Sequence, residues 1–172
     1  MRILGVDPGF ATVGLGYIDC TSAHDIRVGE WLTIQTLPTS SFPQRLEEIA
    51  RDLEEYITQI KPDVAVLEKL FFATNQKTAL DVAHARGVIV LTLQKAGLRI
   101  IEPTPLQLKA CITGDGGADK RQMQEMLKLM LKLDRIPEPD DAADALGLAV
   151  YGAVMQAGVA SRMTNDAVTS EQ

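Results

Sequence analysis

The stretch RILGVDPG, residues 2–9, decides the fold, because it places a carboxylate at the end of an apolar run. The segment 2–6 has the composition of a short buried strand, and the Asp-Pro-Gly sequence that follows ends this strand with a turn. The same arrangement returns at DVAVLE (63–68), a nearly all-apolar run of the kind found in parallel sheets, which ends at Glu68. An acid at the end of each core strand has two explanations. Either each acid simply marks the turn after its strand, or the two acids together form a ligand-binding edge of the sheet.

The hydrophobic patterns along the rest of the chain predict an α/β fold. Strands are expected at 2–6, 13–20, 26–36, 63–68 and 98–101. Helices are expected at 45–60, 76–96, 103–112, 120–133 and from 140 to about 156. The first three strands form an antiparallel meander and the later ones are reached by helical crossovers, which predicts a mixed five-stranded sheet with helices on both faces. Residues 1–158 are expected to form a single domain, and the polar segment 159–172 a flexible tail.

Length and composition fit one ordinary globular domain, since the chain has 172 residues, of which 46% are hydrophobic. The opening run lacks the pattern of a signal peptide, and no stretch is apolar for the length that a membrane span needs. Cys20 and Cys111 are isolated, so free thiols of a cytoplasmic protein are expected and no metal or disulfide framework.

The net charge of −6 is unevenly distributed along the chain. Residues 1–60 carry 4 basic and 9 acidic groups, residues 61–135 carry 12 and 8, and residues 136–172 carry 1 and 6. The middle of the chain is therefore basic and flanked by acidic thirds. This asymmetry is compatible with a localised anion-binding face, although an ordinary mixed surface has the same appearance.

A third group of acids stands at the start of the last predicted helix, in PDDAADAL (139–146). Asp141 and Asp144 lie three residues apart and share one helix face, whereas Asp140 follows a proline and is a candidate N-cap. Each acid taken alone has an ordinary explanation, as a turn former or as a favourable charge at a helix N-terminus. However, the alanines around them would let this helix approach another backbone closely.

Carboxylates that meet in a low-dielectric site repel one another, and a hard divalent cation is the usual remedy. Mg²⁺ prefers oxygen ligands and retains several waters, so few carboxylates per ion suffice. If Asp7 and Glu68 end neighbouring parallel strands, they emerge at the same sheet edge, where α/β proteins bind ligands. The acids therefore predict a site for divalent cations, and two such ions side by side can activate a water and stabilise the leaving oxygen in phosphodiester hydrolysis.

These motifs, in this order, resemble those of the RuvC family of Holliday junction resolvases. The resemblance rests on DPG (7–9), VLEKLFF (66–72), ATNQKTALDVAHARGV (73–88) and DDAADAL (140–146), and it spans about residues 1–158. It implies a ribonuclease H-like fold and a homodimer that cuts two opposed strands of a four-way DNA junction, leaving 5′-phosphate and 3′-hydroxyl ends. The catalytic and metal-binding acids implied are Asp7, Glu68, Asp141 and Asp144, with two Mg²⁺ per subunit, for which Mn²⁺ would substitute.

Several further residues are candidates for DNA contact. Phe71 is the family-like residue for stacking on an unpaired base, while Phe72 fits the core better. Lys109 and Lys120 occupy positions where the family has basic residues, and Arg121 adjoins them. Such contacts set position and affinity rather than sequence choice. Three weaker candidates are Lys69, Lys77 and Arg86.

Two other functions compete with this interpretation. One is half of an actin-like or sugar-kinase ATPase, which also begins with a strand and an Asp-x-Gly turn but needs a second domain. The other is a non-catalytic junction-binding protein of the same fold, against which the complete set of acids argues. The resemblance also implies a bacterial, nucleoid-associated protein that works with the branch-migration proteins RuvA and RuvB.

Overall fold

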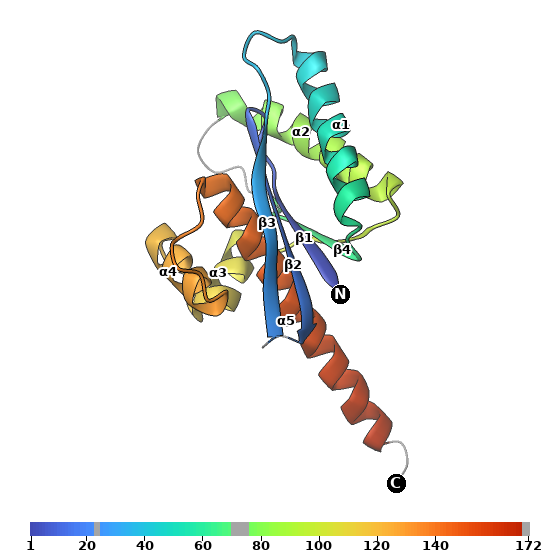
Figure 1. Ribbon diagram of the computed structural model, residues 1–172, viewed down its shortest axis with the longest axis vertical. Coiled ribbons are helices and arrows are strands. Elements are labelled where there is room, and N and C mark those ends of the chain that lie inside the picture. The colour runs from blue at the N-terminus through green and yellow to red at the C-terminus, as the bar shows by residue number, and fades with distance from the viewer. Residues whose placement is uncertain (23–24, 70–75, 170–172) are drawn as a thin grey trace.

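The computed structural model is built around one mixed sheet (Figure 1) and describes residues 1–22, 25–69 and 76–169, with side chains except at 76–78 and 157–169. The strands are β1 (Arg2–Asp7), β2 (Thr12–Ser22), β3 (Asp25–Gln35), β4 (Val64–Leu67) and β5 (Arg99–Ile101). They lie in the order β3-β2-β1-β4-β5. The pairs β1–β2 and β2–β3 are antiparallel, and β1–β4 and β4–β5 are parallel, which confirms the predicted mixed sheet.

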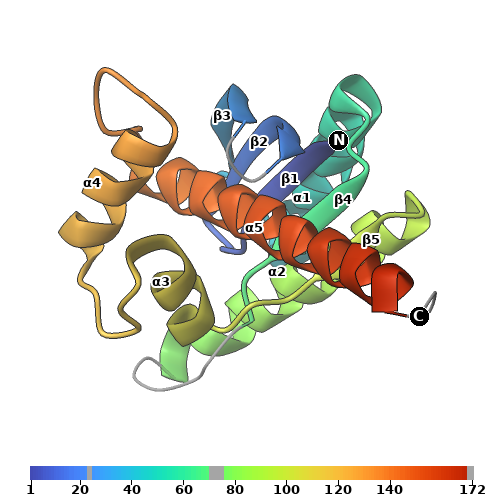
Figure 2. The same ribbon diagram turned by 90° about the horizontal axis from the view of Figure 1, so that it is seen from below.

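Helices cover both faces of this sheet. They are α1 (Phe42–Ile60), α2 (Gln76–Lys95), α3 (Pro105–Thr113), α4 (Lys120–Met130) and α5 (Asp140–Thr169). Figure 2 shows α5 crossing one face of the sheet, with α3 and α4 beside its first half and with α1 and α2 on the other face. The predicted three-layer arrangement is therefore confirmed.

The alternation of side chains along β1 divides the core in two. Ile3 points into the cluster beneath α5, whereas Leu4 and Val6 point into the cluster beneath α1 and α2. This is the period of two that a strand imposes on its side chains. Because both faces of β1 are covered, the polar group at its end can reach solvent only beyond the edge of the sheet.

The backbone of α5 lies unusually close to β1 and β2. A Cβ added at Gly5 would lie 1.9 Å from the carbonyl oxygen of Ala145, and one added at Gly14 would lie 1.9 Å from that of Asp141. Ala142 and Ala145 are fully buried at this contact. The alanine spacing around the acids therefore does what the sequence suggested, since it lets the helix seat directly on the glycines of the strands.

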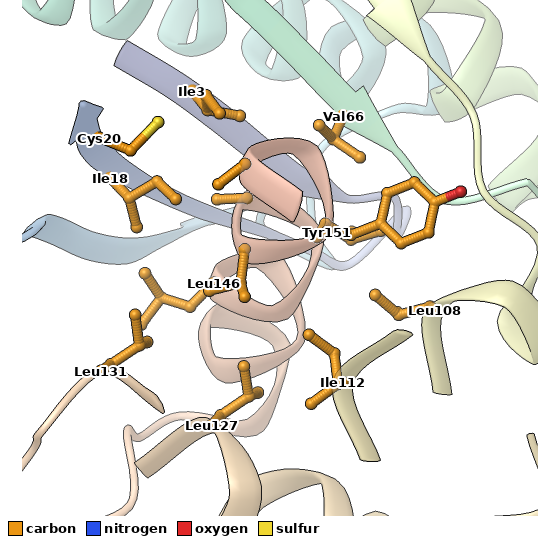
Figure 3. Packing of buried hydrophobic residues seen from close by; sticks show 14 of the residues in the cluster. Ile3, Ile18, Cys20, Val66, Leu108, Ile112, Leu127, Leu131, Leu146 and Tyr151 are labelled. Carbon is orange, nitrogen blue, oxygen red and sulfur yellow. The ribbon is translucent and has the colours of Figure 1, made fainter. Parts of the chain in front are cut away.

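Around this contact, larger side chains close the core (Figure 3). Ile3, Ile18 and Val66 come from the sheet and surround Leu146 and Tyr151 of α5. On the other side of the helix, α3, α4 and the residue after α4 contribute Leu108, Ile112, Leu127 and Leu131. Helices α3 and α4 thus pack onto α5 rather than onto the sheet, and they flank its N-terminal end.

Two predictions about α5 were wrong. The helix continues to Thr169 instead of ending near Gln156, because no proline interrupts the polar sequence that follows. Its C-terminal part extends past the end of the sheet (Figure 1). Asp140 is the first helical residue rather than the N-cap, and the amides of Ala142 and Ala143 donate to the carbonyl of Pro139. The division of the chain at residue 158 stays a prediction.

One long-range contact anchors the segment that leads into α5. The indole Nε1 of Trp31, on β3, donates a hydrogen bond of 3.0 Å to the carbonyl oxygen of Glu138. The residues just before the helix are thereby tied to the meander. None of the described helices is both long enough and apolar enough to cross a membrane.

Candidate active site

The acids at the two strand ends lie side by side. Asp7 is the last residue of β1, and Glu68 directly follows β4. Val6 pairs with Leu67 in the parallel ladder between these strands, so the next residue of each strand leaves the sheet at the same edge. The central expectation from the sequence, that two separate apolar strands deliver their acids to one place, is confirmed.

Helix α5 brings a third acid to this edge. Asp144 lines a pocket of about 210 Å³ together with Asp7 and Glu68. The remaining walls come from α3, α4 and α5, and their lining residues are Pro105, Leu108, Lys109, Lys120, Met123 and Leu148. The pocket is therefore lined by three carboxylates and two lysines.

The fourth predicted acid stands apart from this pocket. Asp141 lines a neighbouring hollow of about 500 Å³, which also contains Phe10 and Arg45. Its charge nevertheless reaches the first pocket, because it contributes to raising the pKa of Asp7. The structure thus brings three of the four predicted acids into one pocket and places the fourth on its flank.

Burial and mutual repulsion shift the titration of the pocket acids. Burial raises the pKa of Asp7 to about 7, and the charges of Asp144, Glu68 and Asp141 add to that effect. Burial also raises the pKa of Glu68, with a further contribution from Asp144. The pKa of Asp144 is raised by burial as well, and Lys120 opposes the shift. These carboxylates are therefore held close enough to destabilise one another when ionised.

The predicted basic residues differ in their positions. Lys109 lines the pocket and its charge opposes the rise in the pKa of Glu68. Lys120 lies 2.9 Å from Asp140 Oδ2 and 3.7 Å from Asp144 Oδ2. Arg121 does not line the pocket, since its side chain is 84% exposed and pairs with Glu125. Phe71 lies outside the described residues.

The oxygen-rich acids fit a hard cation in their chemistry. Across residues 1–22, 25–69 and 76–169, no group of three or more His, Cys, Asp or Glu side chains is placed so that it could by itself hold a metal ion. This does not conflict with Mg²⁺, which is commonly bound through one or two carboxylates together with waters and substrate phosphates. The raised pKa values of Asp7, Glu68 and Asp144 point the same way, because a cation would relieve their repulsion.

Two polar contacts at the site were not anticipated from the sequence. Arg86, considered only as a weak DNA-contact candidate, donates from Nε to the carbonyl oxygen of Glu68 at 3.1 Å. Asp140, interpreted as a helix-end charge, instead pairs with Lys120 at the rim of the pocket. The sequence alone does not predict which partner an arginine or an aspartate will bind, because the pairing depends on how each helix is rotated over the sheet.

The sequence profile of the family described as "Crossover junction endodeoxyribonuclease RuvC" matches residues 3–152. A protein of that name from Brevibacillus brevis is 45% identical over 157 residues, which cover 91% of this chain and 94% of the relative. Another from Alkaliphilus oremlandii is 47% identical over 150 residues, covering 87% and 91%.

A solved structure described as "T. thermophilus RuvC in complex with Holliday junction substrate" is similar in fold. It superposes with a TM-score of 0.84 at 28% identity and covers 91% of this chain and 97% of the other. The structure described as "Thermus thermophilus RuvC structure" gives a TM-score of 0.83 at 27% identity, with coverage of 95% and 97%. The ribonuclease H-like fold expected from the sequence is thereby confirmed.

Proposed function

The chain belongs to the RuvC family of crossover junction endodeoxyribonucleases, and from this premise we propose that it resolves four-way DNA junctions by metal-dependent hydrolysis at the pocket described above. The observation that carries the proposal is the convergence of Asp7, Glu68 and Asp144, from two parallel strand ends and one helix, on one pocket. Two opposed strands would be cut, one by each subunit of a homodimer, to leave 5′-phosphate and 3′-hydroxyl ends.

Asp7, Glu68, Asp141 and Asp144 would hold two Mg²⁺ ions per subunit, with Mn²⁺ as a substitute. When bound, the ions supply an activated water and charge stabilisation for the leaving oxygen. Burial raises the pKa of Asp7 to about 7, so an adjacent cation would favour the ionised form of this carboxylate. Asp141, from its position on the flank, would complete the ligand set from outside the pocket that the other three share.

Positive side chains on the walls would hold the DNA backbone. Lys109 and Lys120 line the same pocket as the acids, so a phosphate bound there would be within reach of both lysines. Arg121, which is exposed one residue further on, would contact phosphate outside the pocket. We assign Phe71 the role of stacking on an unpaired base. Although the net charge of the chain is −6, these lysines would give the DNA phosphates a local positive surface to bind.

The wider setting follows from the family. A homodimer with two-fold symmetry would present two equivalent sites to a junction of matching symmetry. The relatives compared are bacterial proteins, so we expect the enzyme in the cytoplasm, at the nucleoid, with RuvA and RuvB as partners. Membership of a nuclease family argues against both alternatives that the sequence left open, the ATPase half and the non-catalytic binder.

The test is incubation of the protein with synthetic four-way junctions, with and without Mg²⁺, followed by mapping of the nicks on each strand. Paired nicks on opposed strands that DNA ligase can seal are the expected result. Asp7→Asn should retain junction binding and lose cleavage, whereas Glu55→Gln, an exposed acid on α1, should behave as wild type. Mg²⁺-dependent nicking by the Asp7→Asn variant would contradict the proposal.

A further inference from the structure

The backbone that carries Glu68 lies just beyond the ladders of the sheet. Pairing of β4 with β1 ends at Leu67, and its pairing with β5 ends at Val66. In the described part of the chain, no side chain or amide donates a hydrogen bond to the Glu68 carboxylate. The position of this carboxylate therefore depends on whatever holds the main chain at residues 68 and 69.

Arg86 supplies one of these restraints. Its Nε donates to the carbonyl oxygen of Glu68 at 3.1 Å, and its guanidinium also forms an ion pair with Glu102, just past β5. The second restraint is a hydrogen bond of 2.9 Å from the amide of Lys69 to the carbonyl oxygen of Pro103. The end of β4 is thus joined to the end of β5 both directly and through Arg86.

The arginine itself is firmly placed. Ala85 and Ile89, its neighbours on α2, are fully buried against the sheet, so the helix cannot shift without disturbing the core. Only 20% of the Arg86 side chain is exposed. A planar guanidinium can bind two acceptors in fixed directions at once, which the single ammonium of a lysine does not reproduce.

From these contacts we propose that Arg86 is a positioning residue for the metal-binding carboxylate of Glu68, and that Glu102 orients Arg86 for this role. The proposal rests on the function proposed above and refines it. The alternative role, contact with a DNA phosphate, fits the geometry less well, because the donors of Arg86 that face Glu68 and Glu102 are already in use. Displacement of a metal-binding group by about 1 Å can reduce a rate by about 100-fold.

The variants that test this are Arg86→Lys, Arg86→Gln and Glu102→Gln, with Arg99→Gln as the matched control, since Arg99 is an exposed arginine on the adjacent strand β5. Three quantities are measured for each full-length variant. They are the affinity of the protein for Mn²⁺ in the absence of DNA, the affinity for a four-way junction without metal, and the single-turnover cleavage rate as a function of Mg²⁺ concentration.

For Arg86→Lys we expect a cleavage rate about 10- to 100-fold lower, weaker Mn²⁺ binding and a higher half-saturating Mg²⁺ concentration, with junction affinity unchanged within about twofold. Glu102→Gln should show the same pattern at about 3- to 10-fold, and Arg99→Gln should match wild type. If Arg86→Gln fails to fold, the other two variants still decide the matter.

Two results would overturn the proposal. If the Arg86 variants lose junction affinity while Mn²⁺ binding is unchanged, Arg86 is a DNA contact. If Arg86→Lys has wild-type values for all three quantities, Arg86 does not position Glu68. Failure of the wild-type protein to cut junctions would instead refute the function proposed above. The two failures are distinguishable, because the Mn²⁺ comparison needs neither DNA nor cleavage.

Discussion

The two faces of the sheet are packed by different means. Beneath α1 and α2, large aliphatic side chains such as Leu4, Leu53 and Ile89 fill the space between helix and strand. Beneath α5, glycines and alanines let the helix backbone rest on the strands. The first arrangement supplies stability through buried area, whereas the second fixes the height of a helix whose first turns carry Asp141 and Asp144.

The position of α5 is therefore more sensitive to substitution than the positions of α1 and α2. An aliphatic layer tolerates small repacking, because side chains can shift to refill a void. A backbone-to-backbone contact has no side chain to adjust, so any added atom displaces the helix and the acid on it.

Gly5→Ala should be the most damaging change. Its Cβ would lie 1.9 Å from the carbonyl oxygen of Ala145 and 2.7 Å from the amide nitrogen of Ala149, so α5 must move. We expect a loss of about 4 kcal/mol or more in unfolding free energy, at the upper end for single substitutions, and loss of cleavage by whatever protein remains folded. Urea unfolding and a junction-cleavage assay measure the two effects. A variant that folds stably and cuts normally would refute the close contact.

Leu53→Ala is the counterpart on the opposite face. Leu53 is a fully buried residue of α1 that faces the sheet, and its truncation should cost about 2–4 kcal/mol through lost burial and a residual cavity. The expected contrast is that the folded fraction, assayed well below its melting temperature, cuts junctions at the wild-type rate. Impaired cleavage per folded molecule would show that this face also sets the geometry of the site.

Asp7→Asn should stabilise the protein in metal-free buffer. The pKa of Asp7 is about 7 in the folded protein against an ordinary value of 3.8, so the folded state retains a proton that the unfolded state has released. The contribution of Asp7 to the unfolding free energy of the wild type is therefore fully present below about pH 4, and it is lost as the pH rises through about 7. At pH 8 in EDTA the variant should be more stable by about 2–4 kcal/mol, since each pKa unit between the folded and unfolded states corresponds to about 1.4 kcal/mol, and at pH 4 the two should agree within about 1 kcal/mol.

The same comparison includes a metal control. Added Mg²⁺ should raise the melting temperature of wild type more than that of Asp7→Asn, because binding to the native state alone stabilises it. A wild-type protein as stable as the variant at pH 8 without metal would show that Asp7 is not held under electrostatic strain.

Gly87→Ala should have the smallest effect, with the opposite sign from Gly5→Ala. Gly87 lies within α2, and an added Cβ meets no atom within 4 Å among those described. Alanine is the better helix former, so unfolding free energy should rise by about 0.5–1 kcal/mol with cleavage unchanged. Thermal unfolding measures the gain. A loss of stability would reveal that this face of α2 is covered in the native protein, as it would be in a dimer.

The sequence was sufficient for those parts of the site that depend on strand pattern. Asp7 and Glu68 each interrupt the end of an apolar run, and parallel pairing then requires that they meet. The approach of α5 was also foreseeable, because Ala142 and Ala145 leave room beside the acids. These inferences succeed because the spacing of residues along a strand or helix fixes which of them share an edge or a face.

The remainder depends on tertiary geometry that spacing does not encode. The bond from Arg86 to the Glu68 carbonyl joins residues 18 positions apart and is set by the rotation of α2 over the sheet. Asp141 lines the neighbouring hollow rather than the pocket, although its spacing from Asp144 places both on one helical face. Helix α5 is longer than its apolar pattern predicts, because polar residues do not by themselves end a helix.

The hydrogen bond from Trp31 of β3 to Glu138 makes the intrinsic fluorescence of the protein a probe of the start of α5. Trp31 is the sole tryptophan of the chain, and its indole nitrogen is bonded to the residue two positions before the helix that carries Asp144. A shift of that helix on binding metal or DNA would disturb this hydrogen bond and so change the surroundings of this one fluorophore. Its emission wavelength can therefore follow events in the pocket without a label.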